Sequence, residues 1–419
     1  MSPERKRELS WSFYDWANSA FATTIMAGFF PLFFKEYWGA GMEVGESTFW
    51  LGSANSIASI IVAAFAPVLG AIADRGSAKK RFLIFFALMG IVMTGSLFLV
   101  AGGNWGMAVV LYILAIIGFA GGNVFYDSLL PGIADEHRLD VVSALGFALG
   151  YLGGGLLFAI NVCMTLWPEP FGLADSSQAV RVSFLMVACW WAVFSIPVFL
   201  LVDEPGSGES IGFVRATREG FARLVSTFAE IRRLKAVFLF LAGYWLYIDG
   251  VDTIVRMAVD FGLSLGFDAN GLIVALLITQ FVGFPAAIAF GKLGERFGAK
   301  TGIFIGIAVY ICATIWGYFI QSLAEFYMLA VAIGLVQGGV QSLSRSLYTR
   351  LIPQGRAAEF FGFYNMMGKF AAVIGPVLMG WVSVATGNPR VSILALLILF
   401  ISGAIILCFV DVEEGKRTI

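Results

Sequence analysis

The stretch GAIADRGSAK at residues 70–79 is echoed by GKLGERFGAK at residues 291–300, 221 positions later. Both copies follow a long apolar segment, and both place a glycine, a carboxylate–arginine pair and a lysine at the same spacing. A second echo, YDSLLP at residues 126–131 and YTRLIP at residues 348–353, has an offset of 222. Two matches at nearly one offset indicate a unit duplicated in parallel orientation, a repeat type found in secondary transporters.

The composition places the chain in a lipid bilayer. Apolar residues make up 59% of the 419 residues and charged residues 13%, whereas soluble domains are about a quarter charged. Much of the length lies in apolar segments of the roughly 20 residues that about 30 Å of hydrocarbon requires. The net charge of −1 means that the chain lacks the excess of positive charge that nucleic-acid binding requires. We therefore predict an all-α membrane protein without a nucleic-acid partner.

Hydropathy and basic residues together predict the topology. Lys and Arg gather in every other connection, starting with the segment before the first span, while the remaining connections hold little beyond Lys35, Arg181 and Arg390. The positive-inside rule then predicts that both termini are cytoplasmic. The expected location is the bacterial inner (plasma) membrane. Twelve spans are expected near residues 11–37, 48–73, 81–101, 105–130, 140–166, 180–202, 236–261, 269–292, 301–321, 325–350, 358–384 and 390–411.

One long connection, residues 203–235, divides the chain into an N-terminal half (residues 1–202) and a C-terminal half (residues 236–419) of six spans each. The connection opens with the flexible sequence DEPGSG. Apolar residues then recur at three- and four-residue steps with arginines between them, which predicts an amphipathic helix on the inner leaflet that tethers the halves. A regulatory or partner-binding role for this helix remains open.

Residue types that build enzymes are scarce. The single histidine, His137, cannot form a metal site alone, and no nucleotide-binding loop is present. The four cysteines lie in apolar segments far apart in the sequence, where packing is the expected role. We therefore predict neither enzymatic activity nor a cofactor.

The repeated stretch supplies candidate gating residues. Gly70 permits close helix approach, and Asp74 can accept hydrogen bonds from a neighbouring helix N-terminus. Arg75 and Lys79 would face lipid phosphates or a second carboxylate, for which Asp127 is the expected partner. The alternative is a solvated basic loop. The spacing resembles the loop between the second and third spans of major facilitator superfamily transporters. The second copy adds the gating candidates Gly291, Glu295 and Arg296.

A family-level resemblance begins in the first span. The stretch YDWANSAFATT at residues 14–24 resembles the signature of the vacuole-effluxer-like family of the major facilitator superfamily, whose fungal members are autophagy-related vacuolar amino-acid effluxers. Further resemblances lie at NVFYDSLLP (123–131), GFALGYLGGG (146–155) and YIDGVDT (247–253). The resemblance implies a proton-linked or facilitated carrier of small molecules, such as amino acids leaving a compartment. One departure is the absence of the large loops of the fungal proteins.

The seventh predicted span carries four charges on one face. Asp249, Asp252, Arg256 and Asp260 follow one another at three- and four-residue steps. Asp249 lies about 14 residues into the span, or ~21 Å at 1.5 Å per residue, where an unpaired charge is costly. Asp252 and Arg256 could form an internal ion pair. Asp249 needs either Lys369 of the eleventh span as a partner or a bound proton, which makes it the first candidate for proton coupling.

Other polar residues lie on inward faces. Asp15 and Asn18 share one face of the first span, where Asp15 is either a cap or interface anchor or part of the transport pathway. Gln337, Gln341 and Arg345 stack on the tenth span. Buried amides join helices as often as they bind ligands. The two glutamines, Asp15 and Asn18 are therefore candidates for the substrate pathway.

These observations predict an alternating-access secondary transporter, proton-linked, that moves a small zwitterionic solute such as an amino acid, with efflux favoured. The alternative is a carrier of lysophospholipid or amphipathic compounds, and a non-transporting membrane receptor is a further reading. Symport and antiport remain open. The expected partners are the solute, protons and membrane lipids, and the resemblance implies a monomer.

Overall fold

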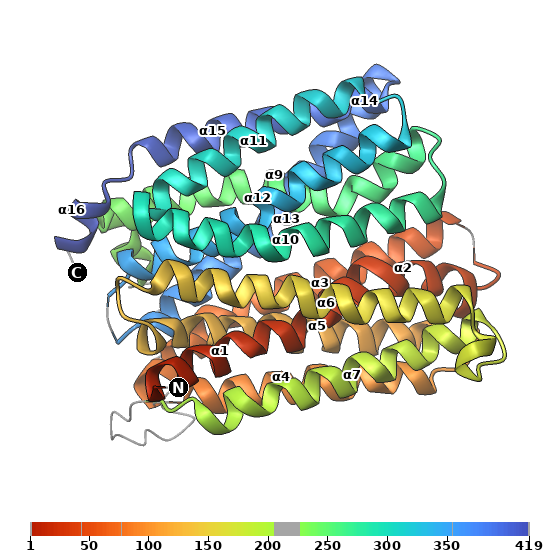
Figure 1. Ribbon diagram of the computed structural model, residues 1–419, viewed down its shortest axis with the longest axis horizontal. Helices are drawn as coiled ribbons and strands as arrows, with labels where there is room; N and C mark the ends of the chain where they lie inside the picture. The colour runs from red at the N-terminus through yellow and green to blue at the C-terminus, as the bar shows by residue number, and fades with distance from the viewer. Residues whose placement is uncertain (1, 43, 77, 205–226, 354, 418–419) are drawn as a thin grey trace.

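The computed structural model describes residues 2–417 except 43, 77, 205–226 and 354. Long helices run side by side through this part of the chain, and the described residues contain no strand (Figure 1). The two chain ends lie at the same end of the bundle. We call this end, with the helix ends around it, the terminal end, and the opposite end the distal end.

The N-terminal half opens with a helix that changes its winding. Ser2 caps the first helix by accepting a hydrogen bond from the Arg5 amide, and Pro3 occupies the first turn. The helix then continues as a π-helix over Phe21–Phe29, a wider winding that is often found at functional sites. The helices of this half are α1 (Pro3–Ala20), α2 (Phe30–Phe33), α3 (Val44–Gly76), α4 (Lys79–Ser96), α5 (Trp105–Ile133), α6 (Leu139–Leu166) and α7 (Ser176–Leu201).

The C-terminal half repeats the arrangement after the connection. Its helix α12 begins with a reciprocal capping box between Ser322 and Glu325, which satisfies amide groups that would otherwise be unpaired. The helices of this half are α9 (Lys235–Ser264), α10 (Ala269–Phe297), α11 (Ala299–Phe319), α12 (Leu323–Leu351), α13 (Ala357–Thr386), α14 (Pro389–Leu394), α15 (Leu396–Cys408) and α16 (Val412–Arg417).

Helix length and hydropathy confirm an all-α membrane fold. Eleven helices among the described residues are long and apolar enough to cross a bilayer, and α13, with the apolar stretch Ile374–Thr386, supplies the twelfth. The first helix starts earlier than the predicted residue 11, because Ser2 and Pro3 already provide a helix start. The predicted amphipathic helix of the connection lies mostly outside the described residues. Its last part, residues 227–233, is described and is helical.

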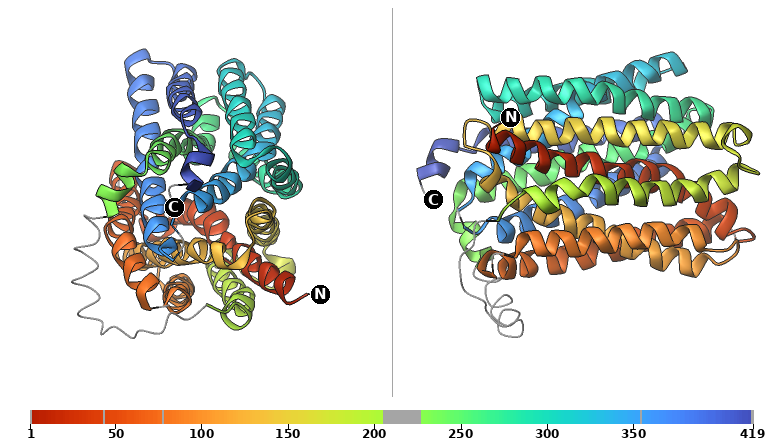
Figure 2. Two further views of the ribbon diagram at one scale, coloured as in Figure 1. Left: turned by 90° about the vertical axis from the view of Figure 1, so that its left-hand side faces the viewer. Right: turned by 60° about the horizontal axis from the view of Figure 1, so that its bottom comes forward.

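Buried apolar side chains form one large cluster in each half. The first draws on residues 11–202 together with Ala358, and the second on residues 231–410. Large apolar side chains are also exposed along the helices, among them Phe85 and Val384, as expected for surfaces that face lipid. The end-on view in Figure 2 shows the red-to-yellow N-terminal half on one side and most of the green-to-blue C-terminal half on the other.

The halves meet along two helix pairs, α3 with α13 and α6 with α10. Glycines allow these close approaches. A Cβ atom on Gly70 would lie 2.6 Å from the carbonyl carbon of Ala358 and 2.9 Å from the Cα of Glu359. In the middle of the bundle, the Tyr151 ring packs where Gly283 lacks a side chain, 3.0 Å from the position of a Cβ.

Gly70→Ala should destabilise the protein by about 1–3 kcal/mol, because the new methyl group meets backbone atoms that cannot rotate away. Thermal unfolding of the purified protein in detergent measures this loss. Gly132→Ala is the matched control, since it also lies near the terminal end and has nothing within 4 Å of its Cβ position. Equal unfolding temperatures for the two variants would contradict the packing argument.

Candidate functional site

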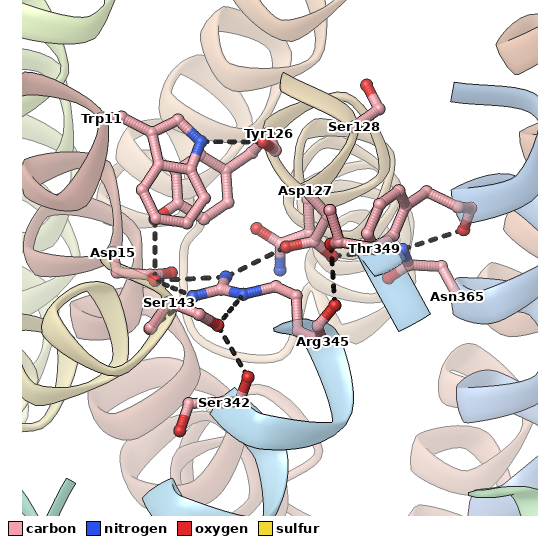
Figure 3. A network of polar contacts seen from close by, with 12 residues as sticks. Trp11, Asp15, Tyr126, Asp127, Ser128, Ser143, Ser342, Arg345, Thr349 and Asn365 are labelled. Carbon is pink, nitrogen blue, oxygen red and sulfur yellow. Dashed lines mark hydrogen bonds and ion pairs between the residues drawn. The ribbon is translucent and has the colours of Figure 1, made fainter. Parts of the chain in front are cut away.

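A single arginine joins the two halves near the terminal end. Arg345 of α12 is only 3% exposed, yet its guanidinium reaches three helices of the N-terminal half. Nη1 donates to Asp127 Oδ1 at 3.0 Å, Nη1 and Nη2 approach Asp15 Oδ2 at 3.5 Å, and Nε donates to Ser143 Oγ at 2.9 Å (Figure 3). Nη2 also donates to the Ser143 carbonyl at 2.8 Å. We call Arg345, Asp15, Asp127 and Ser143 the Arg345 centre.

Aromatic rings cover the charged groups of the Arg345 centre. The guanidinium carbon lies 4.8 Å from the Trp11 ring centroid, 5.4 Å from that of Tyr126 and 4.4 Å from that of Phe147. Such contacts stabilise a cation that has lost its water. The Trp11 indole donates to the Tyr126 carbonyl at 2.9 Å, and the Tyr126 hydroxyl donates to Asp15 Oδ2 at 2.8 Å. The rings therefore hold Asp15 in place as well as covering Arg345.

The C-terminal half also binds Asp127 through α13. The Asn365 amide donates to Asp127 Oδ2 at 3.3 Å, so both carboxylate oxygens of Asp127 are used by the opposite half. From the sequence, Asp127 was the expected partner of the basic residues in the first repeat. That expectation is corrected here. Asp127 pairs with Arg345, and Lys79 pairs instead with Asp74 at 2.8 Å.

Asp74 forms a second contact between the halves. Its carboxylate accepts hydrogen bonds from the backbone amides of Ala358 at 3.1 Å and Glu359 at 2.8 Å, in the first turn of α13. A helix N-terminus offers free N–H groups and a favourable dipole for an anion. The side chain of Arg75 lies outside the described residues.

The second copy of the repeat does not form an equivalent contact. Glu295 and Arg296 are exposed, and Arg296 lies over the ring of Phe297. The corresponding contact is made by Asp140 of α6, which accepts from Arg350 at 2.8 Å and from the Ser346 hydroxyl. Gly291 retains a packing role, since a Cβ there would lie 2.6 Å from the Ala144 methyl group.

Two further arginines tie down the terminal end. Arg356 binds Glu359 at 3.0 Å, Glu230 at 2.6 Å and Thr227 at 2.7 Å, which fixes the last part of the connection to the start of α13. Arg138, before α6, binds Glu8 of α1 at 2.7 Å through two nitrogens. Hydrogen bonding to that carboxylate raises the pKa of Arg138 above its usual range, so the pair stays charged.

A carboxyl group with no charged partner among the described residues lies deep in the C-terminal half. Asp249 of α9 is fully buried and accepts hydrogen bonds from the Gly375 amide at 2.9 Å and the Thr253 hydroxyl at 3.2 Å. Its Oδ2 has no hydrogen-bond partner among the described residues. The predicted partner, Lys369, has a side chain outside the described residues, so that pairing remains a prediction.

The next charges on α9 interact electrostatically with tyrosines of both halves. Asp252 is half-buried and close enough to interact electrostatically with Tyr151 of α6. Arg256 is exposed and interacts electrostatically with Tyr112 of α5. The Tyr112 hydroxyl donates a hydrogen bond to the side-chain Oδ1 of Asn55 at 3.4 Å. One helix face thus carries an anion and a cation, each of which interacts with a tyrosine of the N-terminal half.

The predicted amide candidates separate into three environments. Asn18 donates to Asn123 at 2.7 Å and joins α1 to α5 within the N-terminal half. Gln341 accepts from the Tyr151 hydroxyl at 3.3 Å and joins the halves. Gln337 lines an apolar cavity of about 80 Å³ among α9, α10, α12 and α13, and its Oε1 has no partner in the described part of the chain.

Comparison with known proteins identifies the family. The family model described as "Vacuole effluxer Atg22 like" matches residues 39–419. The chain belongs to the vacuole effluxer Atg22-like family. An uncharacterized MFS-type transporter, YxiO of Bacillus subtilis (strain 168), is 39% identical over 98% of this chain and 96% of its own length. Autophagy-related protein 22 of Yarrowia lipolytica is 26% identical over 82% of this chain and 72% of its own length.

Solved structures show the major facilitator fold. The human organic anion transporter MFSD10 has a TM-score of 0.75 at 13% identity and covers 97% of this chain and 100% of its own. FucP in the outward conformation has a TM-score of 0.71 at 14% identity, with coverage of 98% and 99%. This Atg22-like chain is therefore an integral membrane transporter of the major facilitator type and not an enzyme.

Sequence reasoning missed the central role of Arg345. The residue was noted only as part of a polar stack, although a cation inside an apolar span always needs partners. Its partners are separated from it by 218 and 330 positions. A search for buried opposite charges on the first, fourth and tenth spans would have found the Arg345 centre.

Arg345→Gln should destabilise the protein by about 3–5 kcal/mol, because it leaves buried carboxylates without a cation. Arg296→Gln should cost only about 0–1 kcal/mol, since Arg296 is exposed whereas Arg345 is buried. Thermal unfolding in detergent compares the two. Similar losses would mean that Arg345 is not the main electrostatic contact between the halves.

Proposed function

We propose that this chain is a proton-linked carrier that moves a small zwitterionic solute, such as an amino acid, by alternating access. The main support is the face of α9, where buried Asp249 has no charged partner among the described residues and Asp252 and Arg256 lie one turn apart. We further propose that the terminal end is cytoplasmic and that efflux is the transport direction.

The contacts between the halves support a state closed at the terminal end. The Arg345 centre, the Asp140–Arg350 pair and the Asp74 contact with α13 all join the halves there. Basic residues such as Lys79 and Arg350 at this end favour a cytoplasmic location.

Opposite charges on one helix turn suit a zwitterion. An ammonium group would bind Asp252, and a carboxylate would bind Arg256, whose planar guanidinium matches carboxylate geometry. The indole N–H groups of Trp16 and Trp245 are buried without hydrogen-bond partners in the described part of the chain. They are further donors for an anionic group, because buried donors are normally paired.

A lone buried carboxyl group suits proton binding. A charged Asp249 would be costly in an apolar environment, and Oδ2, which has no hydrogen-bond partner among the described residues, is the oxygen that would take up a proton. Alternating access would expose the group first to one side and then to the other. Proton uptake and release at Asp249 would then follow the transport cycle.

An amphipathic compound is the second candidate substrate. The apolar cavity that includes Gln337, Thr279 and Gln280 offers a polar corner among apolar side chains. That arrangement suits a molecule with an apolar body and one hydrogen-bonding group. The cavity, at about 80 Å³, accommodates only part of such a molecule.

Proteoliposomes loaded with protein should accumulate one class of labelled amino acid when a pH gradient is imposed. Asp249→Asn should abolish gradient-driven accumulation and leave solute exchange intact, because the asparagine cannot carry a proton. Uptake with and without the gradient separates the two activities. Lack of uptake for every amino acid would favour the amphipathic substrate, and gradient-driven uptake by the variant would exclude Asp249 from coupling.

Asp252→Asn and Arg256→Gln should each raise the KM for the solute about tenfold or more, as expected for losing a charged contact of about 1.5–3 kcal/mol. Initial uptake rates over a range of solute concentrations give the KM. Asp260→Asn is the control, because it lies on the same helix and is exposed. An unchanged KM in both test variants would place the solute elsewhere.

A further inference from the structure

The Arg345 centre contains an uneven number of charges. One guanidinium faces two carboxylates, and the side chains of Arg345, Asp15 and Asp127 are only 3%, 13% and 11% exposed. If both carboxylates were ionised, the closed state would hold one uncompensated negative charge away from water. A buried, uncompensated charge is unfavourable by several kcal/mol, and a bound proton removes it.

The two carboxylates are held differently. Asp127 has one oxygen 3.0 Å from Arg345 Nη1 and the other 3.3 Å from the Asn365 amide, as expected for an ionised group. Asp15 approaches both terminal guanidinium nitrogens only at 3.5 Å through one oxygen, to which the Tyr126 hydroxyl also donates. Asp15 therefore has the weaker hold on the cation and is the better site for a proton.

No second cation compensates for the extra charge in the described surroundings. The titratable groups whose charges interact with the two carboxylates are Arg345 and the tyrosines of five helices: Tyr14 of α1, Tyr126 of α5, Tyr151 of α6, Tyr244 of α9 and Tyr364 of α13. Tyrosine is neutral near pH 7. From α6, the hydroxyl and carbonyl of Ser143 also face the centre, and both bind Arg345.

We propose that the Arg345 centre is a proton-binding site that holds one proton, on Asp15, when the halves are joined at the terminal end. The proton comes from water and adds to a carboxylate oxygen of Asp15. The joined state then contains Arg345 paired with ionised Asp127, beside a neutral carboxylic acid. When the halves separate, the proton returns to water.

Linkage gives the direction of the pH effect. Separation of the halves removes Arg345 and admits water, so both carboxylates can be hydrated in their charged form. The proton is consequently bound more tightly in the joined state than in the separated state. Acidification should favour joined halves, and alkalinisation should favour separated halves.

This inference rests on the alternating-access part of the proposed function but uses neither Asp249 nor a particular solute. Asp249 lies within the C-terminal half, whereas the Arg345 centre forms only when the halves meet. A failed transport assay would therefore leave it untouched, and it can fail while transport is normal.

The experiment measures the distance between the halves as a function of pH. Spin labels replace His137 and Arg296, which are both exposed at the terminal end on opposite halves, in a chain whose four cysteines are changed to alanine. Labelling at position 137 also removes the only histidine. Pulsed electron resonance in nanodiscs without solute then gives the joined and separated populations from about pH 5 to about pH 8, where perturbed carboxyl groups titrate.

The joined-to-separated ratio should fall with rising pH by up to about tenfold per unit, the limit for one linked proton. Asp15→Asn makes the Arg345 centre neutral without a proton, so it should remain joined with no pH dependence. Asp127→Asn also leaves one carboxylate for one guanidinium and should lose the pH dependence. Glu8→Gln, a carboxylate bonded within the N-terminal half, should behave as the unsubstituted chain.

Two results would overturn the proposal. One is a distance distribution in the parent chain that does not change with pH. The other is a pH dependence in Asp15→Asn and Asp127→Asn that equals that of the parent chain. A dependence lost only in Asp127→Asn would move the proton from Asp15 to Asp127 and overturn the assignment of the proton to Asp15.

Discussion

The burial of one guanidinium between two halves of a membrane protein is the constraint on which the terminal end depends. A cation of this kind is tolerated inside apolar surroundings only when several acceptors surround it. Here the acceptors come from α1, α5 and α6, while the cation comes from α12. The two halves can therefore close at this end only in the register that brings Asp15, Asp127 and Ser143 to Arg345. The glycine contacts along α3–α13 and α6–α10 permit that register, but they do not select it, because apolar surfaces can slide.

The buried carboxylates of this chain fall into two physical classes. Asp127 and Asp140 are bound by arginines of the opposite half, so their charges are compensated only while the halves are joined. Asp249 is bound by a backbone amide and a hydroxyl of its own half, so its surroundings change less when the halves separate. The charge state of the first class depends on the relative position of the halves. The charge state of the second class depends on whether water reaches the carboxyl group. A carrier that links proton movement to alternating access needs both kinds of response.

The sequence was sufficient to predict the twelve-helix fold, because span length, hydropathy and the internal echo are local or periodic signals. It also singled out Asp74 and Asp249, because one carboxylate lies in the repeated stretch and the other lies deep in an apolar span, which are local features of the sequence. It was insufficient for Arg345 and Asp140, because their importance arises from partners more than two hundred residues away. The π-helix in the first span was missed for another reason. Its residues have the same apolar character as an ordinary span, and only the backbone winding differs.

The two copies of the repeated stretch do not make the same contacts, and this difference affects how the halves separate. The first copy places Asp74 on the N-terminus of α13, whereas the second copy leaves Glu295 and Arg296 exposed. On the other side of the interface between the halves, α6 and α12 are joined by Asp140 and Arg350, which lie outside the repeated stretch. An amide–carboxylate contact at a helix N-terminus depends on the direction of the helix axis, because the amides point along it. An arginine pair tolerates rotation through its long side chain. When the halves separate, a small tilt of α13 should therefore break the contact of Asp74 with the α13 amides first. The Asp140–Arg350 ion pair between α6 and α12 should persist longer.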